Sequence, residues 1–203
     1  MPFYNESEYD GDTWALGSDL LTHAFFACAF RRAARVLAAA SIPTYLYEFS
    51  YALHWLEDDL LHDLGNYHTS ELDFVFGNSW PEFLHGKNFT AEDRFISNTF
   101  QGYWANFVVS GNPNVGPSSP PISWPPFTAG KGPSGEVNLQ MELPLRLVEE
   151  NYAEPCDSVW DPFADALQHL GLGNGGTRVE HFKQWALTLK QQRAAKHSNR
   201  GKL

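Results

Sequence analysis

The segment between Thr90 and Gly111 constrains the fold of this chain more than any other. Residues 90–93, with Thr90 first and Asp93 last, have the spacing of a capping box and predict the start of a helix. Gly111 and the polar turn after it predict its end. Between these signals, mostly apolar pairs recur every four residues: Phe95 and Ile96, Thr99 and Phe100, Tyr103 and Trp104, Phe107 and Val108. Burying each large side chain stabilises a fold by ~1.5–3 kcal/mol, so we expect this helix to be a main core element.

The composition agrees with a globular protein that has a core of its own. The chain has 203 residues, of which 43% are hydrophobic and 19% are charged. Its net charge of -10 argues against a nucleic-acid-binding surface over most of the molecule. No apolar run approaches the ~20 residues that span a bilayer. The first residues also lack the basic start and apolar stretch of a signal peptide.

Further elements are predicted on both sides of this helix. Residues 18–40 have helical spacing, with Ser18 as the N-cap, and we expect Arg31, Arg32 and Arg35 to form a solvated face of that helix. Residues 44–50 alternate aromatic side chains, as in a strand, and residues 136–141 predict a last, edge strand. Residues 171–176 form a glycine-rich break before an amphipathic helix over residues 179–189 and a basic tail.

A second constraining stretch covers residues 64–77 and contains a histidine in a polar turn. His68 is followed by Glu71 and then by an apolar run that ends at Gly77, so the run can anchor the turn to a core. A lone histidine in a loop commonly has no chemical role. His54, His62, Asp63 and His68 could together be interpreted as metal ligands, but their spacing matches no compact ligand motif, and we expect no metal site and no cofactor.

Residues 64–77 resemble the histidine segment of the type B carboxylesterases, the cholinesterase and lipase relatives with an α/β-hydrolase fold. The family pattern is matched at Gly65, His68, Glu71, Leu72, Val75, Phe76 and Gly77. Many members have glycine directly after the histidine, where this chain has Thr69. Residues 103–114, 124–127 and 156–161 resemble further family motifs. The resemblance covers residues 18–163, between an acidic segment at 1–17 and a tail at 164–203.

The resemblance implies the C-terminal part of an α/β-hydrolase fold, with the last strands, their packing helices and an incomplete sheet. It implies that His68 is the histidine of a catalytic triad, and that Glu71 is a nearby supporting carboxylate distinct from the triad acid. It also implies a disulfide between Cys28 and Cys156, whereas two cysteines without a signal peptide would by default be reduced and buried. Asn5 and Asn88 begin glycosylation sequons, which matter in a secreted protein, as full-length relatives often are.

The other parts of a serine esterase are not found in these residues. In this fold the nucleophile lies in a Gly-x-Ser-x-Gly elbow, and the chain order is serine, acid, histidine. The sequence contains no such elbow, and only 67 residues precede His68. We therefore expect the C-terminal third of an ester hydrolase, inactive alone, with an exposed apolar sheet edge. The alternatives are a non-catalytic cholinesterase-like binding module, which the retained His68 disfavours, and a small metal or acid–base protein that uses His54, His62 and Asp63.

Overall fold

The computed structural model describes residues 3–56, 64–78, 88–128, 136–149 and 153–169. It divides into two compact units. The first unit comprises Met1–Thr44, Phe127–Glu136 and Glu149–Leu203, and the second comprises Tyr45–Pro126 and Val137–Val148. The predicted helix over residues 179–189, the glycine-rich break before it and the basic tail lie outside the described residues.

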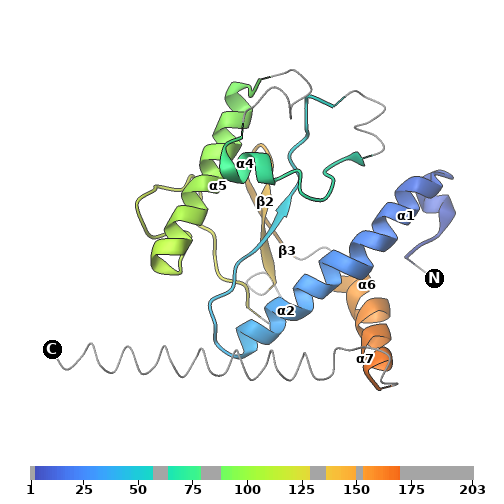
Figure 1. Ribbon diagram of the computed structural model, residues 1–203. Coiled ribbons are helices and arrows are strands. Elements are labelled where there is room, and N and C mark those ends of the chain that lie inside the picture. Colours follow the sequence, from blue (N-terminus) through green and yellow to red (C-terminus); the bar gives the residue numbers. More distant parts are fainter. Residues whose placement is uncertain (1–2, 57–63, 79–87, 129–135, 150–152, 170–203) are drawn as a thin grey trace, which may run out of the picture. The chain divides into compact units, whose positions relative to one another are not determined.

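The first unit is helical. Its N-terminal half contains the 3₁₀ turn η1 (Glu6–Tyr9), α1 (Thr13–Thr22), the π-helical turn η2 (His23–Ala27) and α2 (Cys28–Ala39), which Figure 1 shows as one continuous rod from α1 to α2. Its C-terminal half contains α6 (Ala153–Pro155), the π-helical turn η3 (Cys156–Trp160) and α7 (Asp161–His169). The rod begins before Ser18, because the Asp12 side chain accepts hydrogen bonds from the amides of Trp14 and Ala15 and caps α1.

The π-helical turn changes which residues of the rod are buried. A π-helical turn contains more residues than an α-helical turn, so a stripe counted at 3.6 residues per turn is interrupted there. Leu21, which precedes this turn, and Phe25, which lies in it, are 52% and 68% exposed. The buried residues of α2 are Cys28, Arg31 and Ala34.

The second unit combines a small sheet with two helices, α4 (Leu72–Phe76) and α5 (Ala91–Ser110). The strands β1 (Leu46–Phe49), β2 (Val137–Met141) and β3 (Arg146–Glu149) lie in the order β1-β2-β3, and the last residue of β3 falls in the first unit. β1 runs parallel to β2, with Tyr47 opposite Leu139. The prediction that residues 136–141 form an edge strand is wrong, because β3 pairs on the far side of β2 and makes it the central strand.

The capping box predicted for α5 is confirmed. The Thr90 hydroxyl accepts the Asp93 amide at 3.1 Å, and the Asp93 carboxylate accepts the Thr90 amide at 2.6 Å. Gly111, with φ of 74°, ends the helix in the left-handed conformation. Only part of the predicted stripe is buried. Ile96, Phe100 and Tyr103 are fully buried, whereas Phe95, Phe107 and Val108 are 44%, 45% and 81% exposed.

The core of the second unit lies between α5 and one face of the sheet. Tyr47 on β1 contacts Phe100 and Trp104 of α5 edge to face, and Leu139 and Met141 of β2 are fully buried beside them. The cluster continues through Phe49 of β1 and Phe74 of α4, and through aromatic side chains of the connecting segments, which are Tyr51, Trp55 and Phe89. This core fixes α4, and with it the turn that carries His68.

Two asparagines of the predicted family motif organise the loop after α5. The buried Asn106 amide donates to the carbonyl oxygens of Pro113 and Ser118 at 2.9 and 3.0 Å, and its oxygen accepts the Ser118 amide at 2.9 Å. The Asn114 side chain accepts from the Trp124 amide and donates to the Trp124 carbonyl, both at 2.7 Å. Both asparagines therefore replace backbone partners that the loop cannot supply.

Candidate functional site

The structure places His68 on an exposed turn that leads directly into α4. Residues 68–71 form the turn, in which the Ser70 amide donates to the Tyr67 carbonyl and the Leu72 amide donates to the Thr69 carbonyl, both at 3.0 Å. Because the turn is closed by its own backbone hydrogen bonds, it presents the imidazole of His68 from a defined backbone.

Thr69, next to His68, has an unusual backbone conformation. Its φ is 79°, in the left-handed region that a β-branched residue rarely adopts. Glycine adopts this conformation readily, and glycine is the residue that many type B carboxylesterases have at this position. The turn therefore keeps the shape that suits glycine while it carries threonine.

Helix α4 ties the histidine turn to the core. Phe74 is fully buried, and its carbonyl accepts a hydrogen bond from the Ser97 hydroxyl of α5 at 2.7 Å. Gln101, one turn further along α5, donates to the same hydroxyl at 2.9 Å. Gly77 ends α4 with φ of 67°, and a Cβ there would lie 3.0 Å from the Gln101 side chain. The turn and α4 lie within the predicted stretch 64–77, whereas the contacts from Ser97 and Gln101 were not predicted.

Glu71 lies at the other end of the turn and is half-buried. Burial, with a contribution from the Glu71 charge, raises the pKa of Tyr47 on β1 to about 12. The carboxylate is thus close enough to the sheet for its field to act there.

The alternative metal cluster is only partly described. His62 and Asp63 lie outside the described residues. Nδ1 of His54 lies 3.3 Å from Oδ1 of the fully buried Asp93, which also accepts the Tyr51 hydroxyl at 2.9 Å. Within the described ranges, no group of three or more His, Cys, Asp or Glu residues could hold a metal ion. His54 is therefore a partner of the carboxylate that caps α5, an arrangement that the sequence pattern did not indicate.

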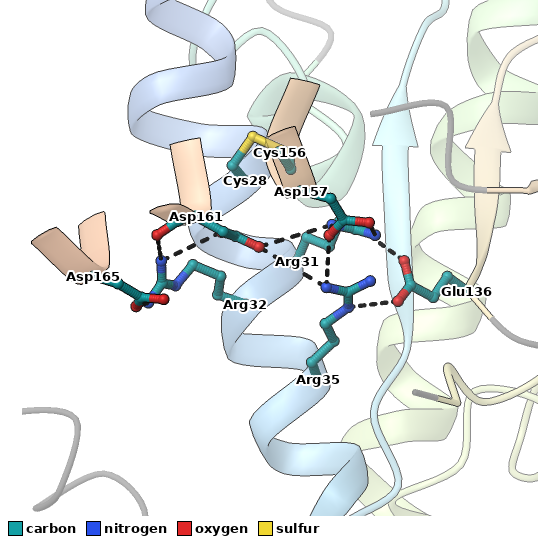
Figure 2. A network of polar contacts seen from close by, with 9 residues as sticks. All are labelled: Cys28, Arg31, Arg32, Arg35, Glu136, Cys156, Asp157, Asp161 and Asp165. Carbon is teal, nitrogen blue, oxygen red and sulfur yellow. Dashed lines mark hydrogen bonds and ion pairs between the residues drawn. A yellow bond between two sulfur atoms is a disulfide. The ribbon is translucent and has the colours of Figure 1, made fainter. Parts of the chain in front are cut away.

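The prediction that the three arginines of the first helical segment form a solvated face is wrong. Figure 2 shows them among carboxylates that are distant in sequence. Arg31 is only 1% exposed, and its guanidinium donates to Glu136 at 2.7 Å and to Asp157 at 2.8 Å. Arg35 contacts the same two carboxylates at 2.5 and 3.0 Å. Helical periodicity could not reveal partners that lie more than a hundred positions along the chain.

Arg32 extends this network at its more exposed end, where it contacts Asp161 and Asp165. Hydrogen bonds from Arg31, opposed by burial, lower the pKa of Asp157 to about 2. Burial raises the pKa of Asp161, although the arginines oppose the rise. Each of the three arginines is therefore paired with carboxylates of the first unit. The network joins segments of that unit, and its guanidinium groups are already engaged rather than open to an anionic ligand.

The predicted disulfide between Cys28 and Cys156 is present beside this network (Figure 2). The two Cα atoms are 5.2 Å apart, and 128 positions separate the cysteines. Cys28 begins α2 and Cys156 begins η3, so the bond joins the same segments that Arg31 and Asp157 join. The default expectation that both cysteines are reduced is therefore wrong.

The two sequon asparagines are both exposed. The Asn5 side chain accepts the Ser7 amide at 3.4 Å and caps η1. Asn88 lies two residues before the α5 cap, whose Thr90 hydroxyl donates to the Asp93 carboxylate at 2.8 Å. In the described part of the chain, no helix is both long enough and apolar enough to cross a membrane.

Comparison with known proteins identifies relatives of this sequence. The sequence profile of the carboxylesterase family matches residues 4–160. Bile salt-activated lipase of Bos taurus is 33% identical over 110 residues, which cover 51% of this chain and 17% of the bovine protein. Carboxylesterase 5A of Homo sapiens is 32% identical over 147 residues, which cover 70% of this chain and 24% of the human protein.

The matched stretch is therefore less than a quarter of the length of either relative. The small sheet and its helices are consistent with part of the α/β-hydrolase fold that this family of ester hydrolases has. The family profile covers most of the chain, and on that ground the chain belongs to the carboxylesterase family.

Proposed function

We propose that this chain supplies the general base, His68, of a serine carboxylic ester hydrolase. The observation that carries the proposal is the exposed His68 on a turn that α4 and α5 hold to the core. A base that transfers protons needs a fixed backbone and an accessible ring; the hydrogen-bonded turn supplies the first and the exposure of His68 supplies the second.

In the proposed reaction, His68 removes the proton from a serine hydroxyl as that oxygen attacks the ester carbonyl carbon. The imidazolium then returns the proton to the alcohol oxygen as the ester C–O bond breaks, which leaves an acyl-serine. A water molecule repeats the sequence: His68 takes its proton, the hydroxyl attacks the acyl carbon, and the proton returns to the serine. In this proposal Glu71 supports the positive charge on His68 through its field and is distinct from the triad acid.

The serine, the triad acid and the oxyanion donors come from another part of a carboxylesterase domain. The 203 residues contain no Gly-x-Ser-x-Gly elbow, and the relatives are more than four times as long as their matched stretch. We propose that residues 18–163 are the C-terminal part of the domain. The chain alone then has no ester hydrolysis, and the substrate of the completed domain is a small carboxylic ester. Asn5 and Asn88 would be glycosylated if that domain is secreted, which removal of N-glycans and mass measurement would reveal.

The test joins the full chain to the part of bile salt-activated lipase that precedes the region of similarity, and measures hydrolysis of p-nitrophenyl butyrate. We expect no turnover by the chain alone, turnover by the joined protein, and a loss of about 10³-fold or more in His68→Ala. The matched control is His169→Ala, which removes another exposed histidine and should leave turnover unchanged. Equal turnover in the parent and in His68→Ala would refute the proposal and favour a non-catalytic binding module.

A further inference from the structure

Tyr4 connects the N-terminal segment of the first unit to both of its π-helical turns. Its hydroxyl oxygen lies 2.6 Å from the indole Nε1 of Trp160, the last residue of η3, and 2.9 Å from Nδ1 of His23, the first residue of η2. Its ring also packs on both side chains, with ring centroids 6.2 and 5.8 Å apart. π-Helical turns occur frequently at functional sites. One hydroxyl group therefore joins the N-terminal segment to residues 19 and 156 positions further along the chain.

The direction of the hydrogen bonds in this cluster follows from the donors available. An indole N–H can only donate, so the Tyr4 oxygen accepts the proton of Trp160. The Tyr4 hydroxyl also has one proton to donate, and in the described part of the chain its other polar contact is Nδ1 of His23. A neutral imidazole that carries its proton on Nε2 accepts a hydrogen bond at Nδ1. The donors of Tyr4 and Trp160 are therefore both satisfied when His23 is neutral.

Protonation of His23 is incompatible with this arrangement. The imidazolium carries a proton on each ring nitrogen, so Nδ1 becomes a donor and can no longer accept from Tyr4. The Tyr4 oxygen would then face two donors, while its own proton would lose its acceptor. Tyr4, His23 and Trp160 are all half-buried, so the unpaired hydroxyl would be partly shielded from water. Acidification should therefore break the contact between Tyr4 and the two turns.

The charged groups around His23 determine how it responds to pH. Burial lowers the pKa of His23, and the negative charge of Asp19, on the last turn of α1, opposes that shift. Asp19 also accepts the Tyr9 hydroxyl at 3.0 Å. Burial and Asp19 raise the pKa of Tyr9 to about 12, so Tyr9 keeps its proton in neutral and acidic solution. The arginines of α2 and the carboxylates of Asp157 and Asp161 are paired with one another. His23 is therefore the group of this cluster that gains a charge on mild acidification.

We infer that Tyr4 and His23 form a pH-sensitive latch, which holds the segment before η1 on the two π-helical turns while His23 is neutral and releases it when His23 is protonated. The hydrogen bond from Tyr9 to Asp19 involves no histidine, so η1 remains attached and the release is confined to residues 3–5. The stability that the latch contributes is present above the unfolded-state pKa of His23 and is lost as the pH falls through its folded-state pKa. The latch lies in the first unit and does not depend on the function proposed for His68, which lies in the second.

The experiment follows the indole N–H of Trp160 by NMR in the full chain as the pH is lowered from ~7.5 to ~4.5. Its exchange with water is compared at each pH with that in His23→Asn, so the pH dependence of the exchange chemistry cancels. Asparagine places a side-chain oxygen that does not titrate near the position of Nδ1, where it can accept the Tyr4 hydroxyl. We expect similar exchange in the two proteins at neutral pH. In acid the parent should exchange at least ~10-fold faster, with the same midpoint as the titration of the His23 ring.

Two further variants and one internal probe serve as controls. Tyr4→Phe keeps the ring and removes the hydroxyl, so the indole N–H should exchange fast at every pH. His169→Asn removes another exposed histidine of the first unit and should leave the acid transition unchanged. The amides of α2 report whether the unit stays folded, and they should keep their protection while the latch opens.

Each outcome either supports or overturns the latch. An acid transition that is present in the parent and absent from His23→Asn would support it. The same transition in His23→Asn, or exchange in the parent that never departs from that of His23→Asn, would overturn it. Slow exchange in Tyr4→Phe would show that the Tyr4 hydroxyl does not hold the indole, and would also overturn it. Loss of α2 protection at the same midpoint would reveal general acid unfolding in place of a local release, which is equally contrary to the inference.

Discussion

The buried arginine of the first unit gives the sharpest test of the energetics described here. Arg31→Met removes the guanidinium while it keeps a long side chain with good helix propensity. Arg31 is 1% exposed and contacts Glu136 and Asp157, whereas Arg35 contacts the same carboxylates from a more exposed position. The substitution therefore leaves two carboxylates with one shared cation, and we expect the first unit to be destabilised.

The magnitude follows from the two ion pairs. The pKa of Asp157 falls from 3.8 to about 2, equivalent to ~2.4 kcal/mol, but its side chain is 35% exposed and shared with Arg35, so about 1 kcal/mol belongs to Arg31. The charged hydrogen bond to Glu136, which is 10% exposed, adds ~1.5–3 kcal/mol. The total of about 3 kcal/mol lies at the lower end of the cost of breaking a buried ion pair, because Arg35 remains.

The assay is native-state hydrogen exchange of the α2 amides, which reports on the first unit without requiring the whole chain to unfold at once. A loss of about 3 kcal/mol should accelerate their exchange by roughly 100-fold or more. Arg32→Met, which removes only partly exposed pairs, should cost less than about 1 kcal/mol. Equal effects of the two substitutions, or no effect of Arg31→Met, would refute the view that this buried guanidinium holds the segments together.

The pH dependence of Arg31→Met has a definite sign. A carboxylate whose pKa is lowered by folding stabilises the protein above its unfolded pKa, and that stability is lost as the pH falls toward the folded pKa. The Asp157 contribution is therefore present above pH 3.8 and is lost toward pH 2. The difference in stability between the parent and Arg31→Met should shrink over this range, while the raised pKa of Asp161 acts in the opposite direction.

Three further substitutions or titrations test other parts of the structure. Thr69→Gly should stabilise the chain by about 1 kcal/mol in urea unfolding, because φ of 79° suits glycine, whereas Thr69→Val should give no gain. Asn106→Leu should cost ~3 kcal/mol and speed exchange of the Ser118 amide, since three backbone groups, one buried and two partly buried, lose their hydrogen bonds to the side chain. Burial lowers the pKa of His23, so its midpoint in an NMR titration should lie below 6.5. The stability that the neutral imidazole contributes above pH 6.5 should be lost as the pH falls through the folded-state midpoint. A midpoint at or above 6.5 would contradict the burial argument.

Local signals in the sequence predicted the elements whose determinants are local. Helix α5 begins and ends where the capping box and Gly111 predict, because a cap depends on residues three or four positions apart. β1 and β2 lie within the two predicted strand segments. The histidine turn was also identified from one short stretch, although its left-handed residue was visible only as a departure from the family pattern at Thr69.

Features that depend on distant partners were not predictable in this way. Helical spacing alone predicts that the arginines of α2 form a solvated face, because their partners Glu136 and Asp157 come from distant parts of the chain. The exposed Phe107 and Val108 of α5 show the opposite error, because helical spacing indicates an apolar stripe but not the width of the surface that covers it. The central position of β2 depends on β3, whose four residues are too few for a clear alternating pattern.

The ion pairs beside the disulfide have a consequence for how that bond recovers after reduction. Arg31 and Asp157 join the two segments that carry Cys28 and Cys156, through contacts that reduction leaves untouched. The separated thiols therefore remain neighbours at a high effective concentration, although they are 128 positions apart in the sequence. Re-oxidation of the folded chain should accordingly be intramolecular and independent of protein concentration, and it should slow when Arg31 is replaced.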